Sequence, residues 1–142
     1  MSSLAVAASK LIADTLTAEA IEGLTVQRTY DPKLDPADIT NPTAIISPAA
    51  WYAERMTRAK HTAKDLVVQV ALAQRIAPGD LDQADQHMAL VEQVINVVEN
   101  ADYQSVPPFH LRGVEADPLL DYQLLNREST LLSVLFTTLT SF

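Results

Sequence analysis

The stretch that decides the fold is Lys64-Asp-Leu-Val-Val-Gln-Val-Ala-Leu-Ala-Gln-Arg-Ile76. Large apolar residues recur at every second position from Leu66 to Leu72, and residues two apart in a strand share one face. The positions between them are mixed and include Val67 and Gln69. The alternation predicts a strand with one apolar and one mixed face, which the following Pro-Gly pair brings to an end.

An amphipathic helix is predicted directly after this strand, over about Leu81–Asn100. Asp80 or Asp82 is expected to cap it. Asp80 and Gln83 stand at the spacing of a capping box, in which the side chain of each residue satisfies the backbone N–H of the other. Apolar residues then recur every three or four positions. They are Leu81, Ala84, Met88, Val91, Ile95 and Val98, with Leu90, Val94 and Val97 alongside. This stripe is wider than one side of a small sheet needs, so we expect part of it to meet a neighbouring subunit.

On the N-terminal side, a first helix is predicted from a cap at Ser2 or Ser3 to about Ile21, with Gly23 as its stop. Lys10 interrupts its apolar start, so the segment makes a poor signal peptide.

Two short strands follow at Thr25–Tyr30 and Thr43–Ser47, with a loop at 31–42 between them. Asp31-Pro32 ends the first strand, and Pro48 closes the second because proline cannot donate to a ladder.

The remaining segments divide into connections and one last strand. Ala49–Ala63 lacks periodicity and is predicted to be a long connection, while 101–121 is irregular with room for one short strand. Leu131–Phe142 predicts a final apolar strand, which is tolerable only when it is paired inside a sheet. The element order indicates a single α+β domain over 1–142. We expect a small, mostly antiparallel sheet with hairpin-like pairing and two main α-helices packed on one face.

The composition excludes several classes of function. A hydrophobic fraction of 48% with 20% charged residues is typical of a folded globule. The absence of Cys excludes disulfides, thiolate nucleophiles and Cys-based zinc sites, and it fits a reducing cytoplasm without excluding secretion. A net charge of −8 repels nucleic acid and anionic lipid at long range but permits a local basic patch. No apolar run approaches the roughly 20 residues that span a bilayer.

No residue pattern predicts catalysis, a cofactor or a metal. His61, His87 and His110 lie far apart in the sequence, and we read His87 as a histidine at the edge of the second helix. The Asp80, Asp82 and Asp85 series begins like a calcium loop, but the glycine and glutamate that such a loop requires are missing. Nucleophile-elbow, Walker and dinucleotide motifs are also missing, so the sequence predicts a non-enzyme.

A basic cluster is the local anomaly of this acidic chain. Arg55, Arg58, Lys60 and Lys64 provide four of its ten cations within ten residues. One interpretation is a solvated loop, and the other is contact with phosphate or with a partner's acidic surface. Trp51 and the tyrosine after it precede the cluster and can anchor an interface or simply pack on the loop. Arg28 and Tyr30 share one face of their strand and can form an exposed pair or an intersubunit contact.

This layout resembles the tail-terminator and tail-completion family of long-tailed phages. The resemblance covers a first helix, the strand Leu24–Tyr30 with its acidic-Pro exit, Ala44–Pro48, an Arg-bearing loop, Asp65–Leu72, an Asp-initiated amphipathic helix and Ser133–Phe142. The segment Asn100–Asp121 departs from the pattern.

The resemblance implies a homohexameric ring that caps the tail tube, joins it to the head-side connector and lets DNA pass through its hole. The implied partners are further copies of the chain, the tube protein and neck proteins, without a membrane, in the virion and earlier in the host cytoplasm. Residues 51–64 are carried over as an interface or lumen element, with Trp51, Arg55, Arg58, Lys60 and Lys64 as site residues. The alternatives are another neck or head-completion subunit, an assembly factor, or a small enzyme or ligand-binding domain with a pocket that the sequence does not reveal.

Overall fold

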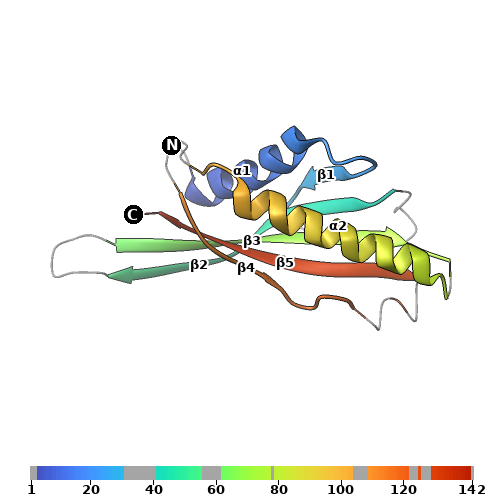
Figure 1. Ribbon diagram of the computed structural model, residues 1–142. Coiled ribbons are helices and arrows are strands. Elements are labelled where there is room, and N and C mark those ends of the chain that lie inside the picture. Colours follow the sequence, from blue (N-terminus) through green and yellow to red (C-terminus); the bar gives the residue numbers. More distant parts are fainter. Residues whose placement is uncertain are drawn as a thin grey trace.

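A computed structural model describes residues 3–30, 41–55, 62–77, 79–103, 109–121, 125 and 129–141, with residues 54, 55 and 62 described by their backbone alone. The elements in chain order are α1 (Leu4–Glu19), β1 (Thr25–Arg28), β2 (Thr43–Arg55), β3 (Thr62–Arg75), α2 (Leu81–Asn100), β4 (His110–Ala116) and β5 (Thr130–Ser141). The strands form one five-stranded sheet in the order β1-β2-β3-β5-β4. The fold is α+β, as predicted, and both helices lie over the same face of the sheet (Figure 1).

The deciding stretch forms the centre of this sheet. β3 pairs with β2 on one side and with β5 on the other, and both pairings are antiparallel. Leu66, Val68, Val70 and Leu72 face the helices and are at most 2% exposed. Burying each such side chain contributes about 1.5–3 kcal/mol of transfer free energy, so this strand is a main source of stability. The expected alternation is therefore confirmed, and its apolar face is the sheet side of the core.

β5 confirms the prediction that a long apolar strand has to be paired inside the sheet. It lies between β3 and β4, and its register with β3 runs without a break from Thr130 to Ser141. Leu131, Leu135 and Leu139 point to the helix side and are fully buried. The short strand expected within 101–121 is β4, which forms the sheet edge beside β5.

Both helices begin at the caps that the sequence indicates. The Val6 N–H donates to Ser3 Oγ at 3.3 Å, and the Gln83 N–H donates to Asp80 Oδ1 at 3.0 Å. The reciprocal half of the predicted capping box is not formed, because the Asp80 N–H donates to the Ala77 carbonyl at 3.1 Å. The Gln83 side chain instead accepts from the Ala77 N–H at 2.9 Å, so it ties the helix to the end of β3. α1 ends at Glu19, slightly before the predicted Ile21, because Ala20 adopts a left-handed conformation with φ 51°.

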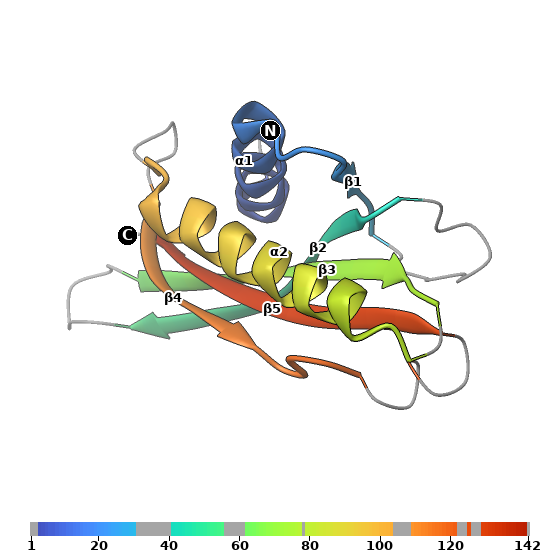
Figure 2. The same ribbon diagram turned by 45° about the vertical axis from the view of Figure 1, so that its right-hand side comes forward.

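The helices form one layer that covers part of the sheet (Figure 2). Ala8, Ile12 and Leu16 of α1 and three valines of α2 join the same buried core. Leu90, Ile95 and Val97 are partly buried against that core. α2 packs against both the sheet and α1, which accounts for the buried part of this wide stripe, whereas Leu81 at its start stays 72% exposed. That part of the stripe meets a neighbouring subunit stays a prediction. Neither helix is long and apolar enough to cross a membrane.

Two predictions about β2 are wrong. The strand does not close at Pro48, and 49–55 is not a connection, because β2 continues to Arg55 and pairs with β3 throughout. A register shift between Pro48 and Ala50 places the proline at an irregularity, where its missing N–H is tolerated. Periodicity failed to reveal this part of the strand because neither of its faces is buried by a helix.

The hairpin-like pairing expected for the first two strands is also wrong. Thr25 lies opposite Thr43 and Arg28 opposite Ile46, so β1 and β2 run parallel. A parallel pair needs a connection of about a dozen residues, and the chain between these strands is long enough to provide one.

Candidate functional site

The most prominent surface feature is the end of the β2–β3 hairpin, which extends beyond both helices (left in Figure 1). We call residues 49–55 and 62–66 the arm; its inner part, with Trp51 and Leu66, still borders α1 at Ala5 and Ala8. Trp51 pairs with Leu66 and Tyr52 with Asp65, so the two aromatic side chains lie on opposite faces. Trp51 is 49% exposed and Tyr52 is 63% exposed. The sequence placed these residues in a loop, whereas the structure places them on a regular ladder.

The arm brings together two of the five predicted site residues. The Nζ atom of Lys64 lies 6.0 Å from the centroid of the Trp51 ring, which is the outer range of a cation–π contact. Both residues stand on the helix side of the ladder, where Lys64 pairs with Ala53. Arg55 is the last residue of β2 and pairs with Thr62. The Arg55 side chain, Arg58 and Lys60 lie outside the described residues.

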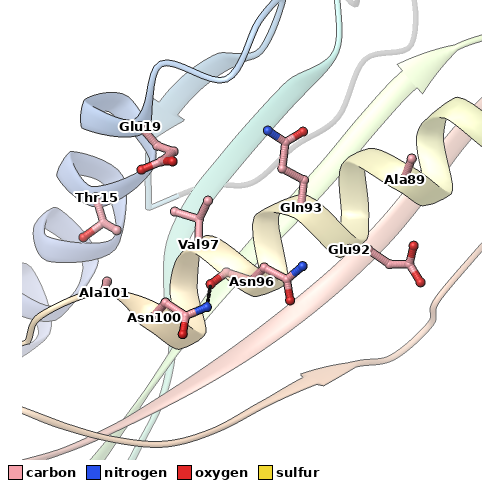
Figure 3. A pocket seen from close by; sticks show the side chains of 9 residues that line it. All are labelled: Thr15, Glu19, Ala89, Glu92, Gln93, Asn96, Val97, Asn100 and Ala101. Carbon is pink, nitrogen blue, oxygen red and sulfur yellow. Dashed lines mark hydrogen bonds between the residues drawn. The ribbon is translucent and has the colours of Figure 1, made fainter.

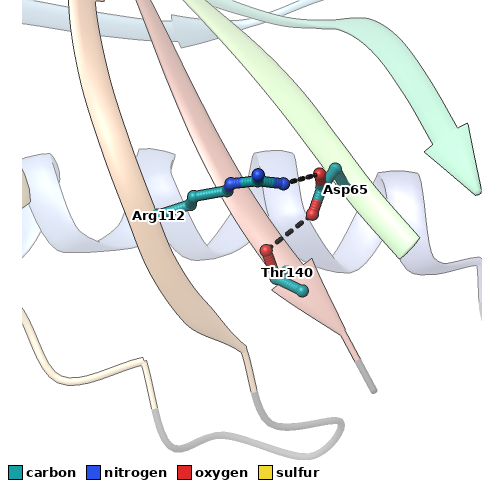
Figure 4. Close-up of polar contacts among 3 residues, drawn as sticks. All are labelled: Asp65, Arg112 and Thr140. Atoms are coloured by element: carbon teal, nitrogen blue, oxygen red, sulfur yellow. Dashed lines mark hydrogen bonds and ion pairs between the residues drawn. The ribbon is translucent and has the colours of Figure 1, made fainter. Parts of the chain in front are cut away.

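The opposite side of the arm is tied to the sheet by Asp65 (Figure 4). Its carboxylate accepts from the Arg112 guanidinium of β4 and, at 2.6 Å, from Thr140 Oγ1 of β5. The three residues come from β3, β5 and β4, which follow one another in the sheet. The Asp65 carboxylate therefore connects the root of the arm with β5 and with the edge strand β4 beyond it. The Asp65 side chain is only 19% exposed, although Arg112 is 66% exposed. Sequence reasoning did not find this cluster.

A second exposed cation and aromatic pair lies at the end of β1, which stops at Arg28, so that Tyr30 follows the strand instead of ending it as predicted. The Arg28 guanidinium carbon is 5.8 Å from the Tyr30 ring centroid, and its Nη1 donates to Ser9 Oγ of α1 at 3.4 Å. The prediction that Arg28 and Tyr30 share a face is consistent with this stacking. Because Arg28 is also bonded to α1, the pair fastens the edge strand to the helix layer.

A groove of about 580 Å³ separates α1 from α2 (Figure 3). Thr15 and Glu19 line it from α1, and Glu92, Asn96 and Asn100 are among the residues that line it from α2. The groove is open and polar, with two carboxylates and several side-chain amides and no cation in its lining. It can therefore receive a basic or hydrogen-bonding partner group.

The acidity of the groove belongs to a larger trend. From Asp80 to Asp102 the chain has six acidic residues and no Lys or Arg. The helix layer is therefore negative, whereas the sequence 55–64 contains four cations and no acid. Opposite charges are concentrated in two different regions of one chain.

His87 is not at the helix edge, as we expected from the sequence, but fully buried between α2 and β5. Burial lowers its pKa from 6.5 to about 4, so the ring is neutral at ordinary pH. The predicted edge position was wrong because the ring finds a polar partner, Ser133, on the strand beneath it. His110 is exposed on β4, and His61 lies outside the described residues.

Among the described residues, no three His, Asp or Glu side chains come together as a metal-binding group. Comparison with models of known protein families and with curated proteins gives no match.

Proposed function

We propose that this chain is a structural subunit of a phage-type virion, in which copies of it form a ring that ends the tail tube. The ring joins the tube to the head-side connector, and DNA passes through its central hole. The partners are other copies of the chain, the tube protein and connector proteins, and six copies are the number that the resemblance implies. The subunit acts by binding and carries out no chemistry.

The observation that carries this proposal is the sheet face opposite the helices. Ile45, Ala71 and Val134 stand side by side on three adjacent strands, and Leu132 and Phe136 flank them on β5. We call these five residues the open apolar face. Both described helices pack on the other side of the sheet, so no described helix covers it.

The open apolar face is exposed only in part: Ile45 and Ala71 are buried at 7% exposure each, and contact with water is left to its three β5 residues. Leu132, Val134 and Phe136 are only half-buried, whereas the leucines that alternate with them on the helix side are fully buried. Burying apolar area contributes about 25 cal/mol per Å², and contiguous apolar patches on soluble proteins mark interaction sites. A subunit that packs this face against its neighbour gains that free energy. In a closed ring every copy buries the face in the same way, so no copy leaves it exposed.

The basic cluster of the sequence, Arg55, Arg58, Lys60 and Lys64, supports passage of DNA through such a ring. Each copy contributes the cations of residues 55–64, so a ring repeats a weak patch around its hole. Such Lys and Arg side chains attract the phosphates of DNA whatever its base sequence, and the attraction weakens as salt is added.

The test is the solution mass of the purified chain, measured by light scattering over a range of concentrations. We expect a single closed species of fixed stoichiometry for the unaltered protein. Phe136→Asp places a charge on the open apolar face and reduces the species to the monomer. Leu81→Asp is the matched control, because Leu81 is 72% exposed at the start of α2 and lies outside that face. A chain that stays monomeric at every concentration, both alone and with isolated tail tubes, would contradict the proposal.

Electron microscopy of intact particles supplies the location. We expect density for this subunit where the tube meets the head-side connector. Density elsewhere in the neck would support the alternative of another neck or head-completion subunit. A subunit needed for assembly but missing from the finished particle would be an assembly factor.

A further inference from the structure

The sheet ends in two edge strands, β1 and β4, which lie on opposite sides of it (Figure 2). Within the described chain each pairs with a single strand, β1 with β2 and β4 with β5. An edge strand presents backbone N–H and C=O groups that can pair with another chain, so natural edges often carry lysine or proline as protection. Neither β1 nor β4 contains either residue. Both edges can therefore accept a further strand.

The hydrogen bonds of β1 show which of its backbone groups turn outward. The Thr25 N–H donates to the Pro42 carbonyl at 2.9 Å, and further along the Thr29 N–H donates to the Ile46 carbonyl at 2.8 Å. Both bonds lie on the β2 side, and successive residues of a strand turn their N–H and C=O groups to alternate sides. The backbone groups of Val26 therefore turn away from β2. Its side chain packs on the edge of the core, on the helix side.

β4 has the same arrangement along its second half. The Asp117 N–H donates to the Val134 carbonyl of β5 at 2.8 Å. By the same alternation, the backbone groups of Ala116 and of Val114 turn away from β5. Both side chains pack on the edge of the core. The register shift of β4 lies before residues 113–116, which form a regular edge of the same length as the four residues of β1.

The two charged side chains of β4 do not block this edge. Arg112 lies in the register shift, and its guanidinium donates to Asp65 across β5 (Figure 4). It is therefore held over the sheet face opposite the helices. Glu115 pairs with Phe136 of the open apolar face, so its side chain lies on that same face. The helix side of the edge is left to small and medium apolar side chains.

Strand directions decide which second strand fits here. β1 runs parallel to β2, and each of the next three pairings is antiparallel, so β4 runs antiparallel to β1. A second copy set beside the first in the same orientation brings its β1 to this β4 in the antiparallel direction. The apolar helix sides of the two edges are then aligned. We infer that β4 of one copy pairs with β1 of the next, so that one sheet continues from subunit to subunit.

This inference rests on the proposed ring and specifies how its subunits are joined. The contact uses two different edges, so any open chain of copies has one edge of each kind free until a ring closes. Pairing of two β4 edges would instead end at a dimer and leave β1 uncovered. Because Phe136 lies opposite Glu115, the strand that a neighbour adds to β4 also comes close to the open apolar face.

Selective cross-linking tests which edges meet, because the chain contains no cysteine of its own. Proteins with Val26→Cys and with Val114→Cys are mixed and treated with a short bis-maleimide, which tolerates a shift in register. We expect a cross-link between the two variants and none within either variant alone. Val26→Cys mixed with Leu81→Cys is the control, because Leu81 is exposed at the start of α2 and not on an edge strand. Within one chain the two edges are four strand spacings apart, about 19 Å, so a short linker does not join them.

Hydrogen exchange tests the backbone pairing without any substitution. The amide protons of Val26 and Val114 should exchange roughly tenfold or more slowly in the assembled protein than in dilute monomer. Thr25 and Asp117 are the internal controls, because their N–H groups already donate within the chain. Their exchange should change much less on assembly.

A pair of substitutions at one position separates the backbone from the side chain. Val114→Pro removes an outward N–H, whereas Val114→Thr keeps that N–H and a similar shape. The proline variant alone should raise the concentration of half-assembly by roughly tenfold or more. Urea unfolding of the dilute protein shows whether the proline variant is folded. If it is not, cross-linking and hydrogen exchange still decide.

Three results would overturn the inference. Cross-links that form only between like variants would show that two identical edges pair. If light scattering shows a closed ring without the mixed cross-link and without slower exchange, the subunits join elsewhere and the ring proposal survives. If the chain stays monomeric at every concentration, also with isolated tail tubes, the ring proposal fails together with this contact.

Discussion

The Nε2 atom of His87 lies 3.0 Å from the Oγ atom of Ser133, and both side chains are fully buried between α2 and β5. The Ser133 hydroxyl donates its proton to the Leu119 carbonyl, so its oxygen is left to accept from His87. The buried ring therefore carries its proton on Nε2, and within the described chain Nδ1 has no partner. This relay joins the helix layer, the central sheet and the segment after β4.

Acid should destabilise the protein through His87. Its pKa is 6.5 in the unfolded chain and about 4 when folded, so between these values the unfolded state binds the extra proton. The stabilisation is complete above pH 6.5 and is lost as pH falls through about 4. The loss amounts to about 3 kcal/mol of unfolding free energy.

Urea unfolding at a series of pH values measures this dependence. His87→Gln keeps an amide N–H that can donate to Ser133 but cannot be protonated, so it removes the contribution of this ring while all other groups still titrate. The difference between the two proteins isolates His87. Parallel curves for the two proteins between pH 4 and 6.5 would contradict the assignment.

Removing the hydroxyls of Ser133 and Thr137, which lie on the same side of β5, should change the free energy of unfolding in opposite directions. Ser133→Ala leaves the His87 N–H unpaired inside the protein and removes the bond to the Leu119 carbonyl, which costs about 1–3 kcal/mol. Thr137 is also fully buried, and its Oγ1 has no hydrogen-bond partner among the described residues. Thr137→Val keeps the shape and should be neutral or stabilising by about 1 kcal/mol. Equal losses in thermal unfolding of the two variants would refute the relay.

The ion pair at the root of the arm should contribute little to stability despite its position. Arg112 is mostly exposed, so the coupling free energy between Asp65 and Arg112 should be about 0.2–1 kcal/mol. A double-mutant cycle with Asp65→Asn and Arg112→Gln measures it. We expect Asp65→Asn to cost more than Arg112→Gln, because Asp65 also accepts from Thr140. A larger cost for the arginine variant would show that the pair, rather than the carboxylate, organises the arm.

The two faces of β5 should respond differently to the same truncation. Leu135→Ala empties a fully buried position on the helix side and should cost about 2–5 kcal/mol. Leu132→Ala makes the same change on the open apolar face, where the side chain is half-buried, and should cost less in the monomer while weakening association. Denaturant unfolding together with light scattering separates the two effects. A large loss of monomer stability for Leu132→Ala would mean that this face is covered within the chain.

The sequence predicted elements whose signal is local. The alternation from Leu66 to Leu72 and the caps at Ser3 and Asp80 each depend on residues within a few positions of one another, and all are present in the structure. β5 could be placed inside the sheet because its apolar length left no other stable position.

The missed features depend on contacts between distant residues. Asp65 and Arg112 are 47 positions apart, and His87 and Ser133 are 46 apart, so no sequence window contains either pair. The outer part of β2 gave no signal because periodicity requires one buried face. Of the predicted site residues, Trp51 and Lys64 meet only because the ladder aligns them, and the groove exists only because two helices lie side by side.

The position of β5 also sets the order in which the molecule can fold. The closest β3–β5 pair, Arg75 with Thr130, is 55 positions apart, and the farthest, Lys64 with Ser141, is 77 apart. Closing such long loops is slow compared with forming helices or the β2–β3 hairpin. Until β5 arrives, one edge of β3 is an unsatisfied template that can pair with strands of other nascent chains. Rapid synthesis of many copies thus favours aggregation before completion, and a chaperone that shields this edge would raise the yield of soluble protein.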